Sequence, residues 1–162
     1  MTLYIIRHAW AEDRDTTRWP DDDQRPLTDK GRKRFKKLLK KLTKGQFAPA
    51  IIATSPLVRC QETAELVAQS LNNQSPIVQL DALKPGSDLS ALVQWTTDRT
   101  EGDVAWVAHA PDVDRLAAQL VGDGQANIRF AKGAVAAIFF DGAITPGAGE
   151  LQWLATAKLL GL

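Results

Sequence analysis

Short runs of apolar residues, separated by polar and turn-forming segments, recur along the whole chain. Runs of this length predict β-strands. The predicted strands span residues 3–6, 50–53, 77–80, 104–108, 134–140 and 151–154. The runs at 51–52 and 104–107 are apolar on both faces, as is typical of inner strands covered by helices. Residues 150–153 alternate between polar and apolar positions and predict an edge strand.

The segments between these runs carry apolar residues at helical spacing, and three such stripes predict helices. The stripes are Phe35, Leu38, Leu39 and Leu42; Leu57, Ala64, Val67, Ala68 and Leu71; and Val113, Leu116, Ala117 and Leu120. Because strands alternate with helices, we expect an α/β fold, a three-layer α/β/α sandwich with a central mixed, mostly parallel sheet. Residues 12–26 show no period and predict a loop over the end of the first strand.

Length and composition narrow the class of protein. The 162 residues fit one domain, 1–162, that buries about two thirds of its unfolded surface. The net charge of +1 indicates no class of partner, and the only cysteine, Cys60, excludes an intramolecular disulfide. We expect a cytoplasmic protein without a membrane anchor, because no secretory pattern is present and no apolar stretch approaches roughly 20 residues.

The chain holds two histidines, and each follows an apolar run. His8 ends the first predicted strand, directly after Arg7, and His109 follows the strand at 104–108. A histidine at a strand end is often only a packing residue, but two of them at one sheet edge favour a functional site. Metal binding is disfavoured because the usual ligand spacings are missing, so we expect no metal and no cofactor.

A second arginine, Arg59, is expected at the same sheet edge. Ser55 is the predicted N-cap and Pro56 the first helical residue, which places Arg59 about one turn inside a helix. Side chains tilt toward a helix N-terminus, so Arg59 would point to the carboxyl ends of the strands, where anions bind. The alternative is a surface ion pair with Glu62 or Glu65.

Two imidazoles and two guanidiniums together predict a phosphate pocket. A neutral imidazole can attack phosphorus, and neighbouring guanidiniums disfavour its protonated form. Arginine forks bind phosphoryl oxygens and stabilise the charge that spreads over them during in-line transfer. His8 is therefore the candidate nucleophile, Arg7 and Arg59 are the candidate phosphate ligands, and His109 is a further donor.

Four short blocks in this order resemble the histidine phosphatases. The blocks are Arg7-His8-Ala9, Arg25-Pro26-Leu27-Thr28 with Gly31, Ser55-Pro56-Leu57-Val58-Arg59 with Glu62-Thr63-Ala64, and His109-Ala110-Pro111. The chain is most similar to the small SixA-type phosphohistidine phosphatases, over nearly its whole length. The resemblance implies a phosphoglycerate mutase-like fold, His8 as the phosphate-accepting nucleophile, and a pocket formed by Arg7, Arg59 and His109.

The chain departs from the wider family at three points. Ala9 replaces the usual glycine, and Trp10 stands where larger members carry polar residues, so we expect its ring at the pocket mouth. The third departure is that no motif identifies the carboxylic acid that protonates the leaving group in larger members. The candidates are Glu12, Asp13 and Asp81.

The lack of a motif for the carboxylic acid that protonates the leaving group favours one class of substrate over another. An alcohol leaving group needs a positioned acid, whereas the imidazole of a phosphoramidate leaves more readily. Only about fifty residues separate Arg59 from His109, which leaves little room for a lid, so the open pocket would admit a protein side chain.

A strongly basic segment, residues 30–44, holds nine lysines and arginines among its fifteen residues. Thr28 is its expected helix cap, and Arg25 is expected to have a structural role, with a place in the pocket as the alternative. A solvated helix face is the simplest interpretation of the basic residues; nucleic acid, an anionic membrane or steering of an acidic phosphoprotein are alternatives. Acidic residues 21–23 are expected nearby.

The sequence thus predicts a cofactor-independent phosphatase that forms phospho-His8 and acts on phosphohistidine in a protein partner, without nucleic acid or membrane partners. One alternative is a phosphatase for small phosphomonoesters, and another is a non-catalytic module that binds a phosphorylated partner. Cys60, beside Arg59, is expected to be a buried inert thiol, with an activated, oxidation-sensitive thiol as the alternative. The pattern does not determine the oligomeric state and is compatible with a monomer.

Overall fold

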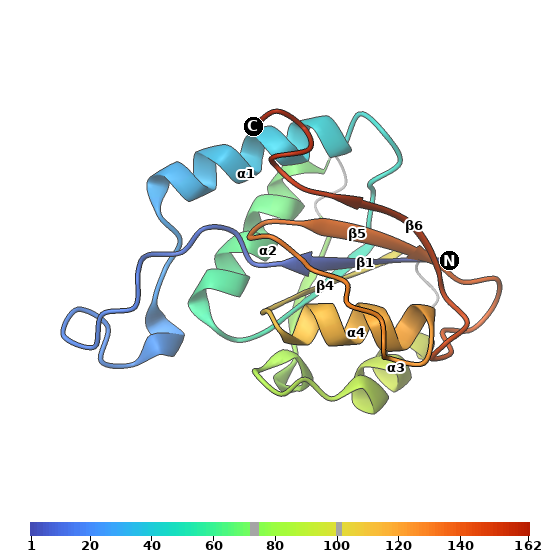
Figure 1. The fold of residues 1–162 in the computed structure, drawn as a ribbon. Coiled ribbons are helices and arrows are strands. Elements are labelled where there is room, and N and C mark those ends of the chain that lie inside the picture. The colour runs from blue at the N-terminus through green and yellow to red at the C-terminus, as the bar shows by residue number, and fades with distance from the viewer. Residues whose placement is uncertain (72–74, 100–101) are drawn as a thin grey trace.

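The structure is a computed structural model that describes residues 1–71, 75–99 and 102–162. Within these residues it contains six strands and four α-helices (Figure 1). The strands are β1 (Thr2–Arg7), β2 (Ile51–Thr54), β3 (Ile77–Gln79), β4 (Val104–Ala108), β5 (Val135–Phe139) and β6 (Glu150–Ala155). The helices are α1 (Asp29–Leu42), α2 (Val58–Ser70), α3 (Leu89–Thr97) and α4 (Asp112–Val121), with short 3-10 helices η1 (Asp22–Gln24) and η2 (Asp81–Leu83).

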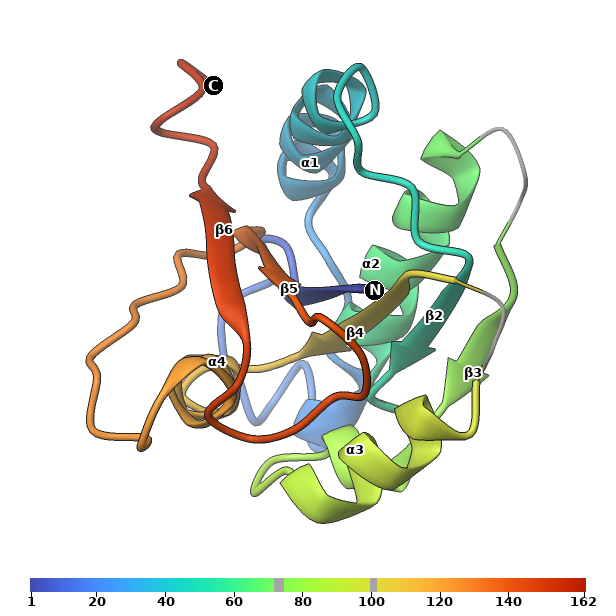
Figure 2. The ribbon, with the colours of Figure 1, turned by 90° about the vertical axis from the view of Figure 1, so that its right-hand side faces the viewer.

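The six strands form one sheet in the order β3-β2-β4-β1-β5-β6. The strands β1, β2, β3 and β4 run parallel, whereas β5 pairs antiparallel with β1 and β6 antiparallel with β5. The helices α1 and α2 cover one face of the sheet, and α3 and α4 cover the other (Figures 1 and 2). This confirms the predicted three-layer sandwich with a mixed, mostly parallel sheet. β2 and β4 are inner strands and β6 is an edge strand, as the pattern predicted.

The core consists of two apolar layers, one on each face of the sheet. Tyr4 and Ile6 of β1 pack in the layer beneath α1 and α2, and Leu3 and Ile5 pack in the layer above α3 and α4. All four side chains are buried, because successive residues of a strand point to opposite faces. With both faces covered, the carboxyl ends of the parallel strands remain as the place where the sheet can bind a ligand.

Three local predictions differ from the structure. Helix α3 was not predicted, because its stripe is short; its start is nevertheless marked by Asp88, whose carboxylate accepts from the Ala91 N–H. The expected loop 12–26 contains η1, which Asp21 caps. Helix α2 begins at Val58 and has no side-chain cap, so Ser55 is not the N-cap and Pro56 is not the first helical residue; Arg59 is the second residue of the helix, not one turn inside it.

Helix α1 begins where the sequence predicted, with the Thr28 hydroxyl accepting from the Gly31 N–H. Trp10 packs against this first turn, and its ring lies 4.4 Å from the Arg34 guanidinium. Trp10 does not line the catalytic pocket described below, which corrects its expected position at the pocket mouth. It instead anchors the segment after β1 to α1.

Replacing Gly31 with alanine should destabilise the protein, although alanine usually stabilises a helix by about 1 kcal/mol relative to glycine. A Cβ at this position would lie 2.3 Å from the Trp10 carbonyl oxygen and 2.9 Å from the Thr28 hydroxyl. We expect a loss of about 1–3 kcal/mol, measured by urea unfolding. Gly122→Ala is the control, because its Cβ would meet nothing closer than 3.8 Å. Equal stability of Gly31→Ala and the parent protein would contradict this packing.

Candidate active site

Both histidines lie at the carboxyl ends of adjacent parallel strands. His8 follows β1 and His109 follows β4, and the two strands pair in parallel with Arg7 opposite Ala108. The imidazole rings consequently face one another, with 5.6 Å between their centroids. Both side chains are buried. The structure therefore brings together the two histidines that the sequence placed at one sheet edge.

The His8 imidazole has a defined tautomer. Its Nδ1 lies 2.7 Å from the Ala9 carbonyl oxygen, and because a carbonyl only accepts, Nδ1 carries the proton. The lone pair is therefore on Nε2, the ring nitrogen available for attack on phosphorus. The neighbouring backbone is also held, since the Ala9 N–H donates to the Thr63 hydroxyl and the Gly133 N–H donates to the His8 carbonyl. The ring is thus oriented before any substrate binds.

His109 is oriented by Ser55. The Ser55 hydroxyl lies 2.9 Å from His109 Nε2, and both side chains are buried. Ser55 reaches this position because its own N–H pairs with the Val107 carbonyl, one strand away. The sequence singled out Ser55 for another role, as a helix cap, and its contact with a residue 54 positions away carried no local signal.

Two arginines, Arg7 and Arg59, lie near the histidines. Hydrogen bonds to the protein use only some of the N–H donors of each guanidinium. Arg7 donates from Nη1 to the Phe130 carbonyl at 2.7 Å, and Arg59 donates from Nη1 to the Asp22 carbonyl at 2.8 Å. Both Nε atoms are buried and have no hydrogen-bond partner within the described part of the chain. Guanidiniums held in this way keep donors for an anion. The sequence expectation that these residues converge is met by the geometry.

A cavity of about 450 Å³ connects these groups. Its lining comprises Arg7, His8, Glu12, Asp13, Arg14, Arg25, Arg59, Pro85, His109, Ala110, Pro111, Asp112 and Lys132. Of the three candidate acids, Glu12 and Asp13 line the cavity. Asp81 does not line it and pairs with Lys84 at 3.0 Å on the surface.

Arg25 is a pocket residue, although the sequence analysis favoured a structural role for it. Its buried guanidinium lines the cavity, donates to the Glu12 carbonyl, and pairs with the Asp22 carboxylate at 2.8 Å. It therefore combines both expected roles, because it also ties η1 to the loop that contains Glu12. A third guanidinium beside Arg7 and Arg59 makes the cavity more strongly cationic than predicted.

Asp22, like the lining residues Arg14, Asp112 and Lys132, was not predicted at the site. Its carboxylate lies 3.4 Å from Arg59 Nη1 and also pairs with Arg25 and, more distantly, with Arg14. The arginines that pair with Asp22 all line the cavity. Residues 21–23 had instead been expected to lie near the basic segment 30–44. The alternative ion pair of Arg59 with Glu62 is wrong, because Glu62 pairs with Arg32 at 2.5 Å.

The pocket holds both histidines neutral. Burial, foremost, lowers the pKa of His8 to about 3, and the charges of Arg59 and Arg7 act in the same direction against the hydrogen bond to Ala9. Burial likewise lowers the pKa of His109 to about 4, again with a contribution from Arg59. A neutral imidazole at neutral pH is the form that attacks phosphorus.

The Cys60 thiol is buried beside this pocket, and its Sγ lies 3.7 Å from the His109 ring nitrogens. Burial raises the pKa of the thiol, which outweighs the opposite effect of Arg59. The thiol is therefore buried, as the sequence predicted, and the raised pKa favours the inert thiol over the activated one.

Lowering the pH from 7 to 5 should reduce the free energy of unfolding. Unfolded histidines titrate near pH 6.5, whereas folded His8 and His109 stay neutral to about pH 3 and 4. The unfolded chain therefore binds more protons in this window, and stability present above about pH 6.5 is lost as the pH falls, by about 1–2 kcal/mol per histidine at pH 5. Urea unfolding at both pH values measures this, and His8→Asn should show a smaller loss. An unchanged loss in His8→Asn would contradict the assignment.

No helix within residues 1–71, 75–99 and 102–162 has the length and hydrophobicity that crossing a membrane requires. No group of three or more histidine, cysteine or acidic side chains converges there in a way that could hold a metal ion.

Comparison with known proteins gives a consistent result. The model of the histidine phosphatase superfamily (branch 1) matches residues 3–85. Phosphohistidine phosphatase SixA of Escherichia coli (strain K12) is 30% identical over 157 residues, which are 94% of this chain and 92% of that protein. An uncharacterized protein of Picosynechococcus sp. is 35% identical over 121 residues, 72% of this chain and 71% of its own length. The structure of the protein histidine phosphatase SixA complexed with tungstate superposes with a TM-score of 0.85, at 26% identity and with 99% of each chain covered.

Proposed function

This chain belongs to the histidine phosphatase superfamily, and we propose that it is a phosphatase for phosphohistidine in a protein, acting through a phospho-His8 intermediate. The observation that carries the proposal is the orientation of His8. Its Nδ1–H is bound by the Ala9 carbonyl, and its Nε2 lone pair is in a cavity lined by Arg7, Arg25 and Arg59. A fixed neutral nucleophile among phosphate ligands is what in-line phosphoryl transfer requires.

The proposed reaction has two steps. The His8 Nε2 lone pair attacks phosphorus, the bond from phosphorus to the substrate imidazole breaks, and the departing imidazole keeps the electron pair and takes a proton from solvent. Water then attacks the phosphorus of phospho-His8 and releases a proton to solvent, the electron pair of the broken bond returns to Nε2, and inorganic phosphate leaves. Arg7 and Arg59 stabilise the charge on the phosphoryl oxygens in both transfers, and His109 adds a donor.

Two arguments support phosphohistidine as the substrate: the chemistry of its imidazole leaving group and the similarity to the SixA proteins. The lining holds three carboxylates, Glu12, Asp13 and Asp112. Glu12 pairs with Arg18, and Asp112 pairs with Arg115 and accepts from the Gly86 N–H, so these two are already engaged and are not free to serve as the acid that an alcohol leaving group would need. The relative at 30% identity is named as a phosphohistidine phosphatase, and the superposed structure holds tungstate, which is a tetrahedral oxyanion like phosphate. These points favour a phosphoramidate over an alcohol phosphate.

The experiment compares two substrates and follows the label on the enzyme. The protein is incubated with a ³²P-phosphohistidine-bearing carrier protein and, separately, with p-nitrophenyl phosphate, and released phosphate and acid-labile enzyme-bound label are measured. Faster turnover of the phosphohistidine, with transient label, supports the proposal. Turnover of the monoester alone would replace it with a small-molecule phosphatase. Phosphate binding without turnover of either substrate would indicate a binding module.

A further inference from the structure

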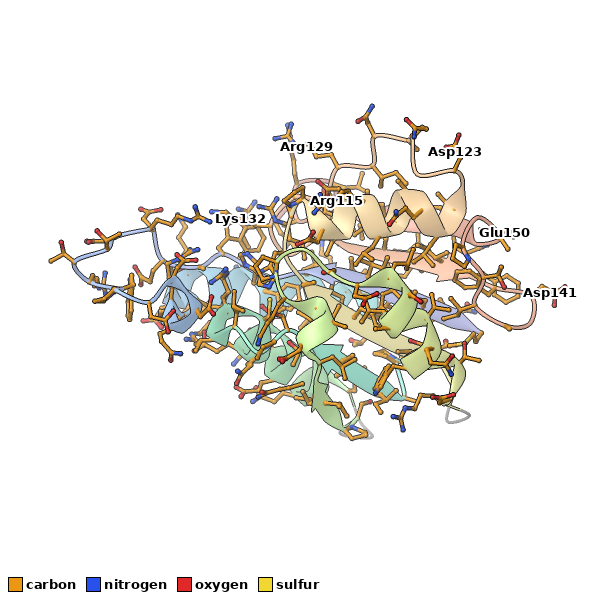
Figure 3. All side chains as sticks on the ribbon, turned by 90° about the horizontal axis from the view of Figure 1, so that it is seen from below. Arg115, Asp123, Arg129, Lys132, Asp141 and Glu150 are labelled. Carbon is orange, nitrogen blue, oxygen red and sulfur yellow. The ribbon has the colours of Figure 1, made fainter. Side chains whose placement is uncertain are left out.

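The surface beside the catalytic cavity is divided by charge. Arg115, Arg129 and Lys132 lie at the end of α4 next to the cavity, and Asp123, Asp141 and Glu150 lie at the opposite end (Figure 3). Helix α4 begins directly after His109-Ala110-Pro111, so its first turn is at the cavity wall. The cationic end of this surface therefore adjoins the site at which the phosphoryl group would bind.

A second hollow of about 530 Å³ lies on this cationic end. Its lining comes from α4 and from residues 124–129, which follow α4 in the chain. Pro111 lines both this hollow and the catalytic cavity, so the two adjoin at this residue. A polypeptide whose side chain enters the cavity would reach the hollow by crossing Pro111.

The cations at this hollow and at the adjoining cavity differ in whether a carboxylate already pairs with them. Arg115 pairs with the Asp112 carboxylate, which also accepts from the Gly86 N–H. Asp114, which also lines the hollow, accepts from the Phe130 N–H and has no cation within ion-pair distance among the described residues. Arg129 and Lys132 are exposed and, in the part of the chain that the structure describes, neither has a carboxylate within ion-pair distance. Their charges remain available to an anionic partner.

The field of Arg129 also extends to the catalytic cavity. Burial is the main reason that the pKa of Arg7 is lowered; Asp114 opposes this effect, and the charge of Arg129 adds to it. At Arg7 the effect of Asp114 is larger than that of Arg129, so the attraction of an acidic partner rests on the exposed, unpaired charges of Arg129 and Lys132, which lie at the hollow and at the cavity respectively.

We propose that this hollow docks an acidic segment that flanks the phosphorylated histidine of the protein substrate. The inference rests on the proposed function and deepens it by naming the substrate class, a phosphohistidine with aspartate or glutamate nearby in sequence. Complementary charge across such a surface raises the association rate and selects among partners. Nucleic acid fits less well, because the described lining of the hollow has no aromatic side chain on which bases could stack.

The test uses two synthetic phosphohistidine peptides of equal length, one with glutamates and the other with glutamines around the phosphohistidine. The kcat/KM of the parent protein should be about tenfold higher for the glutamate peptide, since a few exposed ion pairs each contribute modestly. Arg129→Glu should abolish this preference and leave hydrolysis of the glutamine peptide within about twofold. Lys37→Glu, which makes the same charge change on the exposed face of α1, should retain the preference.

Equal kcat/KM for both peptides in the parent protein, or a preference that survives in Arg129→Glu, would overturn the docking proposal. Tighter binding of a single-stranded oligonucleotide than of the glutamate peptide would also overturn it. Docking is measured separately from turnover. The same peptides are made with a non-hydrolysable phosphohistidine analogue, and fluorescence anisotropy gives the affinity of the protein for each. If neither phosphohistidine peptide is hydrolysed, the proposed function fails, whereas the anisotropy preference still decides the docking proposal.

Discussion

Replacing His8 with alanine should abolish turnover and remove the acid-labile label from the protein. His8 is the group that forms the covalent bond to phosphorus, and no second imidazole can replace it, because His109 Nε2 is engaged by Ser55 at 2.9 Å. We expect kcat to fall by about 10⁴-fold or more, as for other covalent nucleophiles. Phosphate release and label formation are measured together in a rapid-quench experiment with a phosphohistidine substrate.

The control is that His8→Ala still folds and binds phosphate. The pocket arginines are held by backbone carbonyls, Arg7 by Phe130 and Arg59 by Asp22, so their positions do not depend on His8. Inorganic phosphate should therefore raise the melting temperature of the variant, as we also expect for the parent protein. Label that persists in His8→Ala would mean that another residue accepts the phosphoryl group.

Replacing Arg59 with alanine should lower kcat/KM by about 10³-fold, because a buried guanidinium that stabilises phosphoryl charge contributes on this scale. The side chain is almost fully buried, and Asp22 orients it through both its carbonyl and its carboxylate. Arg59→Lys should restore little, since an ammonium group has no planar fork to bind two oxygens. Steady-state kinetics on a phosphohistidine peptide measures both variants.

Lys37→Ala is the matched control for Arg59→Ala, because it removes one positive charge from an exposed position on α1, outside the cavity lining. Its kcat/KM should remain within about twofold of the parent value, as expected of a screened surface charge. A tenfold or smaller loss in Arg59→Ala would show that Arg59 does not bind the phosphoryl group. Full recovery in Arg59→Lys would show that charge alone suffices.

Most of the fold was predictable because its signals are local. The apolar run 104–108 coincides with β4, and the polar-apolar alternation at 150–153 correctly identified β6 as an edge strand. Helix α3 was not predicted because the apolar stripe on its nine residues is too short to recognise. Its stability comes from packing of Leu92 beneath the sheet. Short helices are stabilised by tertiary contacts more than by their own sequence.

The residues of the candidate site were likewise predictable only where their position has a local signal. His8, His109 and Arg7 could be predicted to converge because each lies at the end of a strand, and parallel neighbours bring such ends together. Ser55 and Asp22 could not be assigned, since their contacts cross 54 and 37 positions of sequence. No periodicity or cap signal encodes a contact between a loop and a distant helix.

The layers, the mostly parallel sheet and the residues at its carboxyl edge follow from the amino-acid pattern, because strand and helix periods are properties of neighbouring residues. The tautomer of His8, which the Ala9 carbonyl selects, and the place of Arg25 in the cavity follow from long-range folding. The structure also shows that Glu12 lines the cavity and Asp81 does not, and that Trp10 packs against the first turn of α1 and not at the pocket mouth. The direction of a side chain and its hydrogen-bond partners depend on which distant segments fold against it, and that information is not contained in any local stretch of the chain.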